Sequence, residues 1–523
     1  MAGRLDDQSR GEVTDASPAP VANRGAITVS IMLATFMQGV DTTIANVALP
    51  HMQGSFSVSQ DQIAWVVTSY IVAAAIMTPL TGWLAGRFGI KYVFLISVVG
   101  FTLASALCGS ATSLAQLVIY RLLQGICGAA LVPLSQSVLL QINPPQRHAK
   151  AMSVWGMGVI LGPIIGPVLG GWLTDDLNWR WVFYINLPVG VLASAGILIF
   201  IHETRRAHRE PFDFFGFATL SLAIGALQML LDRGELKDWF GSTEIWIEAT
   251  IAGLAFYLFV VHTATATDRS FLNHDLLKDA NCTVGTILMF LVAIPLFGTM
   301  ILLPTMMQAL MNYPVVTTGL VTAPRGAGTM IAMFLVARLV GRIDTRLIIL
   351  TGMVLTATAL WQMTGFSLYM GMGPIISTGV LQGFGLGFVF TPLSIVTFST
   401  LPRQILTHGT AIFSLTRNIG SSVGIAIVEA LLAENTQTVH SRLVEHLRPD
   451  NPLAHAPYLA APYSLATPAG VAALNAEATR QAAMVAYIDD FKLMMMIVIV
   501  GLPLLLLLRR PRAAAGEAPA AAE

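Results

Sequence analysis

The sequence G-V-I-L-G-P-I-I-G-P-V-L-G-G occupies residues 158–171 and decides how the rest of the chain is interpreted. Gly158, Gly162, Gly166 and Gly170 recur every four residues, so a helix would carry all four on one face. Repeated glycines and prolines would break this helix in water, but in a bilayer neighbouring helices satisfy the freed backbone groups. The stretch therefore predicts a bent membrane helix. Its glycine face suits either a sliding contact between moving helices or an ordinary packing seam.

The composition extends this prediction to the whole chain. Of 523 residues, 55% are hydrophobic and 11% are charged, whereas soluble domains carry about 25% charged residues. Lys plus Arg and Asp plus Glu balance at 29 each, which gives no sign of a nucleic-acid partner. The 3 cysteines all lie in apolar segments, without the spacing of a disulfide framework or a zinc site. We therefore expect an all-α integral membrane protein.

Apolar segments long enough to cross a bilayer, roughly 20 residues each, recur along the chain. They predict fourteen transmembrane helices, at 27–49, 62–84, 92–112, 114–140, 149–171, 180–202, 213–231, 245–263, 280–304, 315–340, 346–367, 374–398, 407–431 and 488–508. Most Arg and Lys residues of the short loops fall on the side of both termini, which predicts cytoplasmic termini. One segment on the opposite side, 432–487, is long and polar, so it is either a functional loop or a tolerated insertion, and its alanine-rich end, 472–487, could be a short helix.

An internal repeat organises these helices. L-A-G-R-F-G-I-K at 84–91 parallels L-V-G-R-I-D-T-R at 339–346, and L-Q-G at 123–125 parallels L-Q-G at 381–383. Both pairs keep the same side of the membrane, as in the parallel repeat of the major facilitator fold. The expected divisions are a disordered cytoplasmic tail (1–24), an N-terminal six-helix bundle (25–202), a linker with two inserted helices (203–279), a C-terminal six-helix bundle (280–510) and a disordered cytoplasmic tail (511–523).

Two charged residues lie deep in the first bundle. Asp41 and Arg121 are roughly 12 and 10 Å from the outer ends of their predicted helices, so they could pair. Burial disfavours a charged carboxylate and a neighbouring arginine favours it, so helix movements would change its affinity for a proton. The alternatives are proton coupling and a static buried salt bridge.

Other polar side chains lie in the predicted helices. Arg325 and Arg417 are near the middle of theirs, with either structural or substrate-binding roles. Further candidates for a substrate cavity, as opposed to simple packing, are Gln38, Asn46, Trp65, Tyr70, Gln124, Gln136 and Gln382. The sequence holds no H-E-x-x-H, G-x-S-x-G or Walker motif, so we expect neither an enzyme nor a cofactor or metal site, and an ion gradient must drive transport.

Several motifs resemble one family, the 14-helix drug:proton antiporters of the EmrB/QacA type within the major facilitator superfamily. They are V-D-T-T-I-A-N-V-A-L-P at 40–50, R-L-L-Q-G-I-C-G-A-A-L-V-P-L-S-Q-S at 121–137, the glycine stretch at 158–171, and W-R-W-V-F-Y-I-N-L-P-V-G at 179–190. The resemblance spans about residues 25 to 510 and is strongest to the EmrB-like subgroup of Gram-negative bacteria.

The resemblance implies a multidrug efflux antiporter of the bacterial inner membrane, driven by protons, with Asp41 and Arg121 in coupling. It also implies that lipophilic substrates pass to a periplasmic adaptor protein and an outer-membrane channel. Gating between the halves would involve Gly82, Arg87, Gly89 and Lys91 in the loop after the second helix, and Gly158, Gly162, Gly166, Pro167 and Gly170 in the fifth. This loop departs from the family, because Gly86 replaces the usual Asp of the gating salt bridge.

Other functions remain open at this level. The same machinery would serve a dedicated exporter of one metabolite, lipid or siderophore, and nothing in the cavity candidates separates the two. Proton symport for uptake is disfavoured by the fifth-helix motif, through the resemblance. A membrane sensor or enzyme is disfavoured because the sequence shows no soluble domain and no catalytic motif.

Overall fold

The computed structural model describes residues 23–202, 212–265, 274–402, 404–447, 463 and 467–509. The predicted tails, 1–24 and 511–523, lie outside these residues apart from Asn23 and Arg24. The described residues are almost entirely helical, and their β pairing is one isolated bridge between Val340 and Ile343. The predicted all-α fold is therefore confirmed.

The first half of the chain forms long helices, several of them broken in two. They are α1 (Arg24–Phe56), α2 (Gln60–Met77), α3 (Leu80–Phe88), α4 (Ile90–Ser110), α5 (Leu114–Gly128), α6 (Leu131–Ile142), η1 (Pro145–Arg147), α7 (His148–Asp176), α8 (Trp181–Tyr184) and α9 (Asn186–Phe200). The axes of α2 and α3 differ by 57°, and Pro79 lies at the break, where its ring excludes a regular helix. The predicted ranges 62–84 and 114–140 thus each correspond to two consecutive helices.

The second half follows an extra pair of helices. The pair is α10 (Phe214–Arg233) and α11 (Thr243–Thr265), linked by η2 (Glu235–Lys237) and η3 (Trp239–Gly241). Then come α12 (His274–Lys278), α13 (Ala280–Ala309), α14 (Val315–Leu339), α15 (Thr345–Met363), α16 (Met372–Phe398), α17 (Leu406–Val444), α18 (Pro468–Gly501) and η5 (Leu502–Leu507). Each of the fourteen ranges predicted to span the membrane falls on one helix or on consecutive helices.

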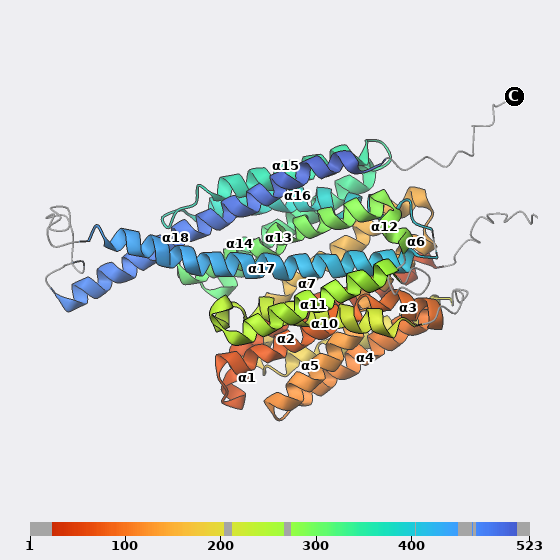
Figure 1. Cartoon of the computed structure of the whole chain (residues 1–523), viewed down its shortest axis with the longest axis horizontal. Helices are drawn as coiled ribbons and strands as arrows, with labels where there is room; N and C mark the ends of the chain where they lie inside the picture. Colours follow the sequence, from red (N-terminus) through yellow and green to blue (C-terminus); the bar gives the residue numbers. More distant parts are fainter. Residues whose placement is uncertain are drawn as a thin grey trace, which may run out of the picture.

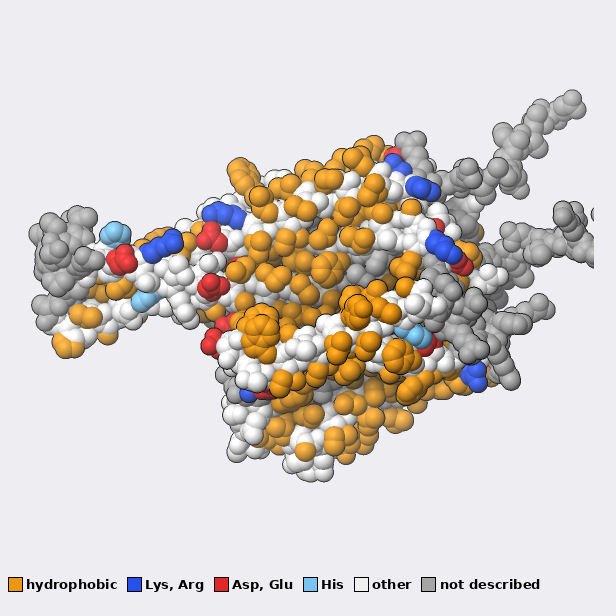
Figure 2. All heavy atoms as spheres, viewed as in Figure 1, with side chains coloured by type: hydrophobic (Ala, Val, Ile, Leu, Met, Phe, Trp, Pro, Cys, Tyr) orange, Lys and Arg blue, Asp and Glu red, His pale blue; other side chains and the backbone are white. Residues whose placement is uncertain are grey.

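The described helices are long and apolar enough for a membrane. Twelve helical stretches meet that description, or 13 when the bent pair α2 and α3 counts as one span. Helix α7 covers the glycine-rich range 149–171. Hydrophobic side chains cover the middle of the face seen in Figure 2, while charged side chains lie mostly near the helix ends. This distribution is what a bilayer core requires.

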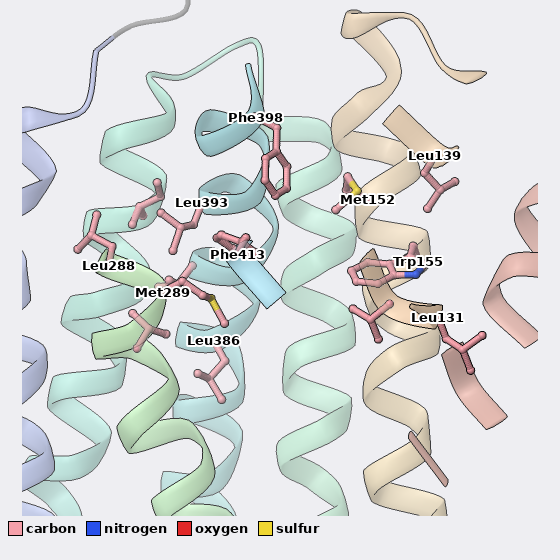
Figure 3. Packing of buried hydrophobic residues seen from close by; sticks show 14 of the residues in the cluster. Leu131, Leu139, Met152, Trp155, Leu288, Met289, Leu386, Leu393, Phe398 and Phe413 are labelled. Atoms are coloured by element: carbon pink, nitrogen blue, oxygen red, sulfur yellow. The ribbon is translucent and has the colours of Figure 1, made fainter. Parts of the chain in front are cut away.

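The helices gather into two groups that lie side by side (Figure 1). Helix α1 packs on α7 and α9 and helix α5 packs on α2 and α4, whereas α16 packs on α14 and α15 and α17 packs on α13 and α18. Between the groups, α7 contacts α14 and α16, and the rings of Trp155 and Phe390 stack with centroids 6.3 Å apart. Figure 3 shows Trp155 and Met152 among the buried residues of this region, across from Phe398 and Phe413.

Helix α10 lies against α2 of one group and α17 of the other, and α11 packs on α10 (Figure 1). Leu220 and Ile224 of α10 join a buried cluster with Ala75 of α2 and Leu415 of α17. Polar contacts to α2 reinforce the packing, since Thr68 donates a hydrogen bond to Asp232. The inserted pair therefore covers part of the junction between the two groups.

The segment 432–487 differs from the polar loop expected there. Helix α17 continues to Val444 and α18 begins at Pro468, so most of the segment is helical. Both helices project beyond the rest of the bundle in Figure 1, and His440 Nε2 lies 2.9 Å from Asn475 Oδ1 between them. Hydropathy marks only the part of a helix that lies in lipid, which is why it predicts a loop for these polar extensions. The short helix indicated by the alanine-rich end, 472–487, is present as part of α18. Residues 448–462 lie outside the described chain.

Candidate functional site

A buried carboxylate occupies the centre of the N-terminal group. Asp41 on α1 is fully buried, and its Oδ2 accepts a hydrogen bond from Arg121 Nη1 on α5 at 2.7 Å. Its Oδ1 accepts from Gln124 Nε2 and from Asn186 Nδ2, both at 2.8 Å. The structure thus brings Asp41 and Arg121 together, as their predicted depths suggested, within a network that ties α1, α5 and α9 to one carboxylate.

Arg121 is held from several directions. Its Nε donates to the carbonyl of Val66 at 3.1 Å, and its Nη1 also donates to Gln124 Oε1 at 2.8 Å. The guanidinium lies over the ring of Tyr70, 4.4 Å from the centroid, in a cation–π arrangement. Gln124 and Tyr70, which were candidates for the substrate cavity, therefore belong to the Asp41 network.

Asn186 was not singled out by the sequence reasoning. It begins α9, is 2% exposed, and its Nδ2 donates to Ser105 Oγ at 3.0 Å as well as to Asp41. Ser105 in turn donates to the carbonyl of Phe183 at 2.8 Å. A polar asparagine within the apolar run I-N-L-P-V-G was the available signal, because a membrane helix buries such a side chain only when it has partners.

The hydrogen-bond partners of Asp41 in this network are all donors. Arg121, Gln124 and Asn186 all present N–H donors to Asp41, so the site is complementary to an ionised carboxylate. A proton on Asp41 would remove the charge that Arg121 faces and replace a lone pair that a donor now uses. Protonation therefore weakens the contacts that connect α1 to α5 and α9.

The glycine face of α7 packs on α1 within the same group. A β-carbon at Gly162 would lie 2.7 Å from the carbonyl carbon of Gly39, and one at Gly170 would lie 2.9 Å from Ile44 Cγ1. Gly158 faces Met32, and Gly166 faces Thr43 in the same way. The close approach is thus to the helix that carries Asp41 and not across the junction between groups. Pro167 lies in α7, but its side chain is outside the described set.

The contact of α7 with the other group uses a different face. A β-carbon at Gly156 would lie 2.9 Å from Met333 Cε on α14, and one at Gly319 would lie 3.6 Å from Val168 Cγ2. Helix α7 therefore touches α1 on one side and α14 on another. The glycine stripe therefore faces α1, and its part in gating between the halves stays a prediction.

Of the loop residues predicted to act in gating, Gly82 lies in the first turn of α3, and Arg87, Gly89 and Lys91 lie where α3 meets α4. A β-carbon at Gly82 would be 2.7 Å from His408 Cγ on α17, so Gly82 lies at the junction of the groups. Gly89 has φ +92° and links α3 directly to α4, a backbone conformation that favours glycine. Arg87 lies over the Trp83 ring at 5.4 Å, and Lys91 Nζ donates to the carbonyl of Leu198 at 2.8 Å.

The remaining candidates for a substrate cavity are dispersed. In the N-terminal group Gln38 is half-buried, Asn46 is exposed, and Trp65 lies under Arg233 of α10 at 5.1 Å. Gln136 is fully buried, and within the described chain its side-chain amide has no hydrogen-bond partner.

In the C-terminal group Arg417 Nη2 donates to Asn418 Oδ1 at 3.3 Å. Arg325 Nη2 donates to the carbonyl of Leu296, and Gln382 Nε2 to Thr299 Oγ1, both at 3.0 Å. Over the described ranges, no group of three or more His, Cys, Asp or Glu side chains is placed to hold a metal ion.

Comparisons with known proteins agree with this architecture. The family model described as Major Facilitator Superfamily matches residues 31–425. The multidrug export protein EmrB of Escherichia coli (strain K12) is 37% identical over 437 residues, which cover 83% of this chain and 85% of EmrB. The fatty acid resistance protein FarB of Neisseria gonorrhoeae is 34% identical over 442 residues, covering 84% and 87%.

Solved structures show the same fold. The human organic anion transporter MFSD10 (TETRAN) superposes with a TM-score of 0.59 at 15% identity, covering 91% of this chain and 99% of that one. The proton:xylose symporter XylE superposes with a TM-score of 0.58 at 14% identity, covering 90% and 94%. At such identities the likeness concerns the arrangement of helices alone.

Proposed function

The chain belongs to the Major Facilitator Superfamily and is EmrB-like within it, and on that premise we propose that it exports lipophilic drugs in exchange for protons. It is a secondary transporter and not an enzyme, as members of this superfamily are. The two six-helix groups, 25–202 and 280–510, act as the bodies that rock about a central substrate site, with 203–279 as an inserted helix pair.

One observation carries the proton coupling: a fully buried carboxylate whose partners all donate hydrogen bonds to it. In the ionised state Asp41 holds α1, α5 and α9 together. When a proton binds, the Arg121 contact weakens and α1 is free to shift relative to α5. The proton gradient thereby acts on a helix position, and no cofactor is required.

Helix α7 passes that shift to the other half. Its glycine face touches the backbone of α1 at Gly39, two residues from Asp41, and its other face touches α14. Because α7 presents no side chains at these glycines, the two helices can move together or slide past each other. The loop with Gly82, Arg87, Gly89 and Lys91 takes part in gating, because Gly82 meets the start of α17 at the junction.

Substrate contacts come from side chains outside the Asp41 network. We assign them to Gln38, Asn46, Trp65, Gln136, Arg325, Gln382 and Arg417. The relationship to FarB, which is named for fatty acid resistance, favours a second candidate, a dedicated exporter of one amphipathic lipid or metabolite. The two candidates share the same coupling site and differ in the breadth of the substrate range.

The distribution of basic residues supports a membrane location and an orientation for the protein. We place it in the bacterial inner membrane with both termini in the cytoplasm, because the basic loop residues lie on that side. The paired extensions of α17 and α18 then project into the periplasm. They offer a contact for a periplasmic adaptor protein that leads to an outer-membrane channel.

Transport in proteoliposomes tests the proposal. Purified protein with an imposed pH gradient should move a lipophilic dye against its concentration gradient, and a panel of unrelated dyes separates a multidrug exporter from a dedicated one. Asp41→Asn should abolish movement driven by the pH gradient while the variant still elutes as a folded monodisperse species. Undiminished, gradient-driven transport by Asp41→Asn would refute the coupling role.

A further inference from the structure

A hydrogen bond between two hydroxyl groups joins the N-terminal and C-terminal groups directly. Ser137 Oγ on α6 and Thr407 Oγ1 on α17 are 2.8 Å apart, and either oxygen can be the donor. Ser137 is fully buried and Thr407 is 6% exposed, in the region where α6 packs on α17. Unlike the Asp41 network, which lies within one group, this contact depends on how the two groups sit against each other.

Both residues lie at the same end of the junction. Ser137 is in the second half of α6, and Thr407 is in the first turn of α17. The next residue, His408, is the one that packs on Gly82 of α3. Two consecutive residues of α17 therefore contact two different helices of the N-terminal group. In the proposed orientation this is the cytoplasmic end of the transporter.

The charged residues of the nearby loop contact their own group. The Arg87 guanidinium lies over the ring of Trp83, 5.4 Å from its centroid, and Lys91 Nζ donates to the carbonyl of Leu198 at 2.8 Å. Gly86 has no carboxylate to offer at the position where the resemblance leads us to expect an Asp. Neither basic side chain of this loop thus forms the gating salt bridge, and the hydroxyl pair supplies a contact of another kind.

The hydroxyl pair has few other ways to satisfy its hydrogen bonds. Gln141 Nε2 donates to Ser137 Oγ at 3.0 Å, so Ser137 still has a hydroxyl hydrogen to give to Thr407. The buried apolar cluster that contains Leu139 of α6 and Phe413 of α17 extends through both groups (Figure 3). A hydroxyl buried in such a junction is costly when its partner is removed, whereas in an open junction water replaces the partner.

We propose that Ser137 and Thr407 form an uncharged latch that holds the cytoplasmic ends of the two groups together. They are positioning residues of the transport cycle, because the bond exists only while this end of the junction is closed. The inference rests on the proposed function, since it assigns a contact to one stage of alternating access. A single neutral hydrogen bond favours the closed state by a small margin, so modest differences in substrate or proton binding suffice to release it.

Spin labels at Tyr92 and Leu347 report whether this end is open or closed. These exposed residues lie in the first turns of α4 and α15, one in each group. In the purified full-length protein in lipid nanodiscs, Thr407→Val keeps the shape of the side chain but leaves the Ser137 hydroxyl buried without this partner. It should raise the ratio of open to closed molecules about 5-fold or more, the worth of one buried hydrogen bond.

Three further variants separate a hydrogen bond from a change in packing. Thr407→Ser keeps the hydroxyl and should retain the wild-type ratio. Thr410→Val is the matched control, because the Thr410 hydroxyl donates to the Thr407 carbonyl within α17, and it should leave the ratio unchanged. Adding Ser137→Ala to Thr407→Val removes the unpaired hydroxyl, so the double variant should open less than the product of the two single effects.

The effect of Thr407→Val should be equal at low and high ionic strength, because salt screens charges and not a neutral hydrogen bond. An unchanged ratio in Thr407→Val, an equal effect of Thr410→Val, or independent effects in the double variant would overturn the latch. Loss of the effect at high ionic strength would also overturn it. These distances need no substrate, whereas failure of the wild type to export an uncharged dye under a pH gradient overturns the proposed function.

Discussion

Removing both charges of the Asp41–Arg121 pair should destabilise the protein by less than the sum of the losses from removing each charge alone. Asp41→Asn leaves a guanidinium that is 1% exposed without its counter-charge, and it places an amide N–H₂ where the three partners require an acceptor. Breaking a buried ion pair from one side costs about 3–5 kcal/mol. Arg121→Gln should cost a similar amount, because it leaves the Asp41 carboxylate with only its two amide donors.

The double variant Asp41→Asn with Arg121→Gln measures how strongly the two residues stabilise each other. Since it leaves no buried charge, its loss of unfolding free energy should be smaller than the sum of the single losses by about 2 kcal/mol or more, within the range of coupling for residues in direct contact. The measurement is reversible unfolding of the purified protein in mixed micelles. Transport driven by a pH gradient should be absent in the double variant, although part of the lost stability is recovered.

Two results would contradict this account. Additive losses in the double variant would show that Asp41 and Arg121 do not stabilise each other in the folded protein. Recovery of gradient-driven transport together with stability would show that Asp41 serves the fold and not the coupling. A double-mutant cycle at Lys492 and Asp489, an exposed pair 2.9 Å apart on α18, is the control. The interaction energy of this pair should be about 0–1 kcal/mol.

Three further outcomes are expected. Gly162→Ala places a methyl group against the backbone of α1 and should cost about 1–3 kcal/mol of unfolding free energy. Gly171→Ala, which has open space around it, should cost nothing. Equal losses in the two variants would refute the close packing of α7 on α1. Gly82→Val should push α3 away from His408 on α17, and the distance between spin labels on the two groups should increase. An unchanged distance distribution would show that this contact does not determine the separation of the two groups. Replacing 440–475 with a short Gly/Ser linker should abolish co-purification with a periplasmic adaptor while dye transport in proteoliposomes persists; retained co-purification would count against the projecting helices as the contact.

Much of the fold could be predicted because lipid imposes strict rules on sequence. A span must be apolar over its whole length, so the ranges of the helices followed from hydropathy, and the L-Q-G repeat indicated two related halves. Asp41 and Arg121 were found for the same reason, since charges in apolar helices are rare and their depths could be compared.

The sequence could not show which helix a given face packs against, or which residue a buried polar side chain contacts. The four-residue glycine spacing identified a face of α7 but not the helix that it meets, and that helix is α1 in the same group. Asn186 was not singled out, because an asparagine within the predicted helix 180–202 does not show which residue it contacts, and the structure places its Nδ2 2.8 Å from Asp41. Beyond residue 431, polarity no longer distinguishes a loop from a helix in water, and the pairing of α17 with α18 decides between them.

The position of α10 and α11 has a consequence for how the chain is made. Asp232 and Arg233 of α10 find their partners, Thr68 and Trp65, on a helix that the ribosome has already released. Leu220 and Ile224 also pack on Leu415, which emerges from the ribosome much later. We therefore expect biogenesis to proceed in two stages, in which a nascent chain that ends near residue 265 has formed these polar contacts before α17 covers the apolar face of α10. A translocon-arrested chain of that length should already protect α10 from proteases, and arrival of α17 should complete the seal.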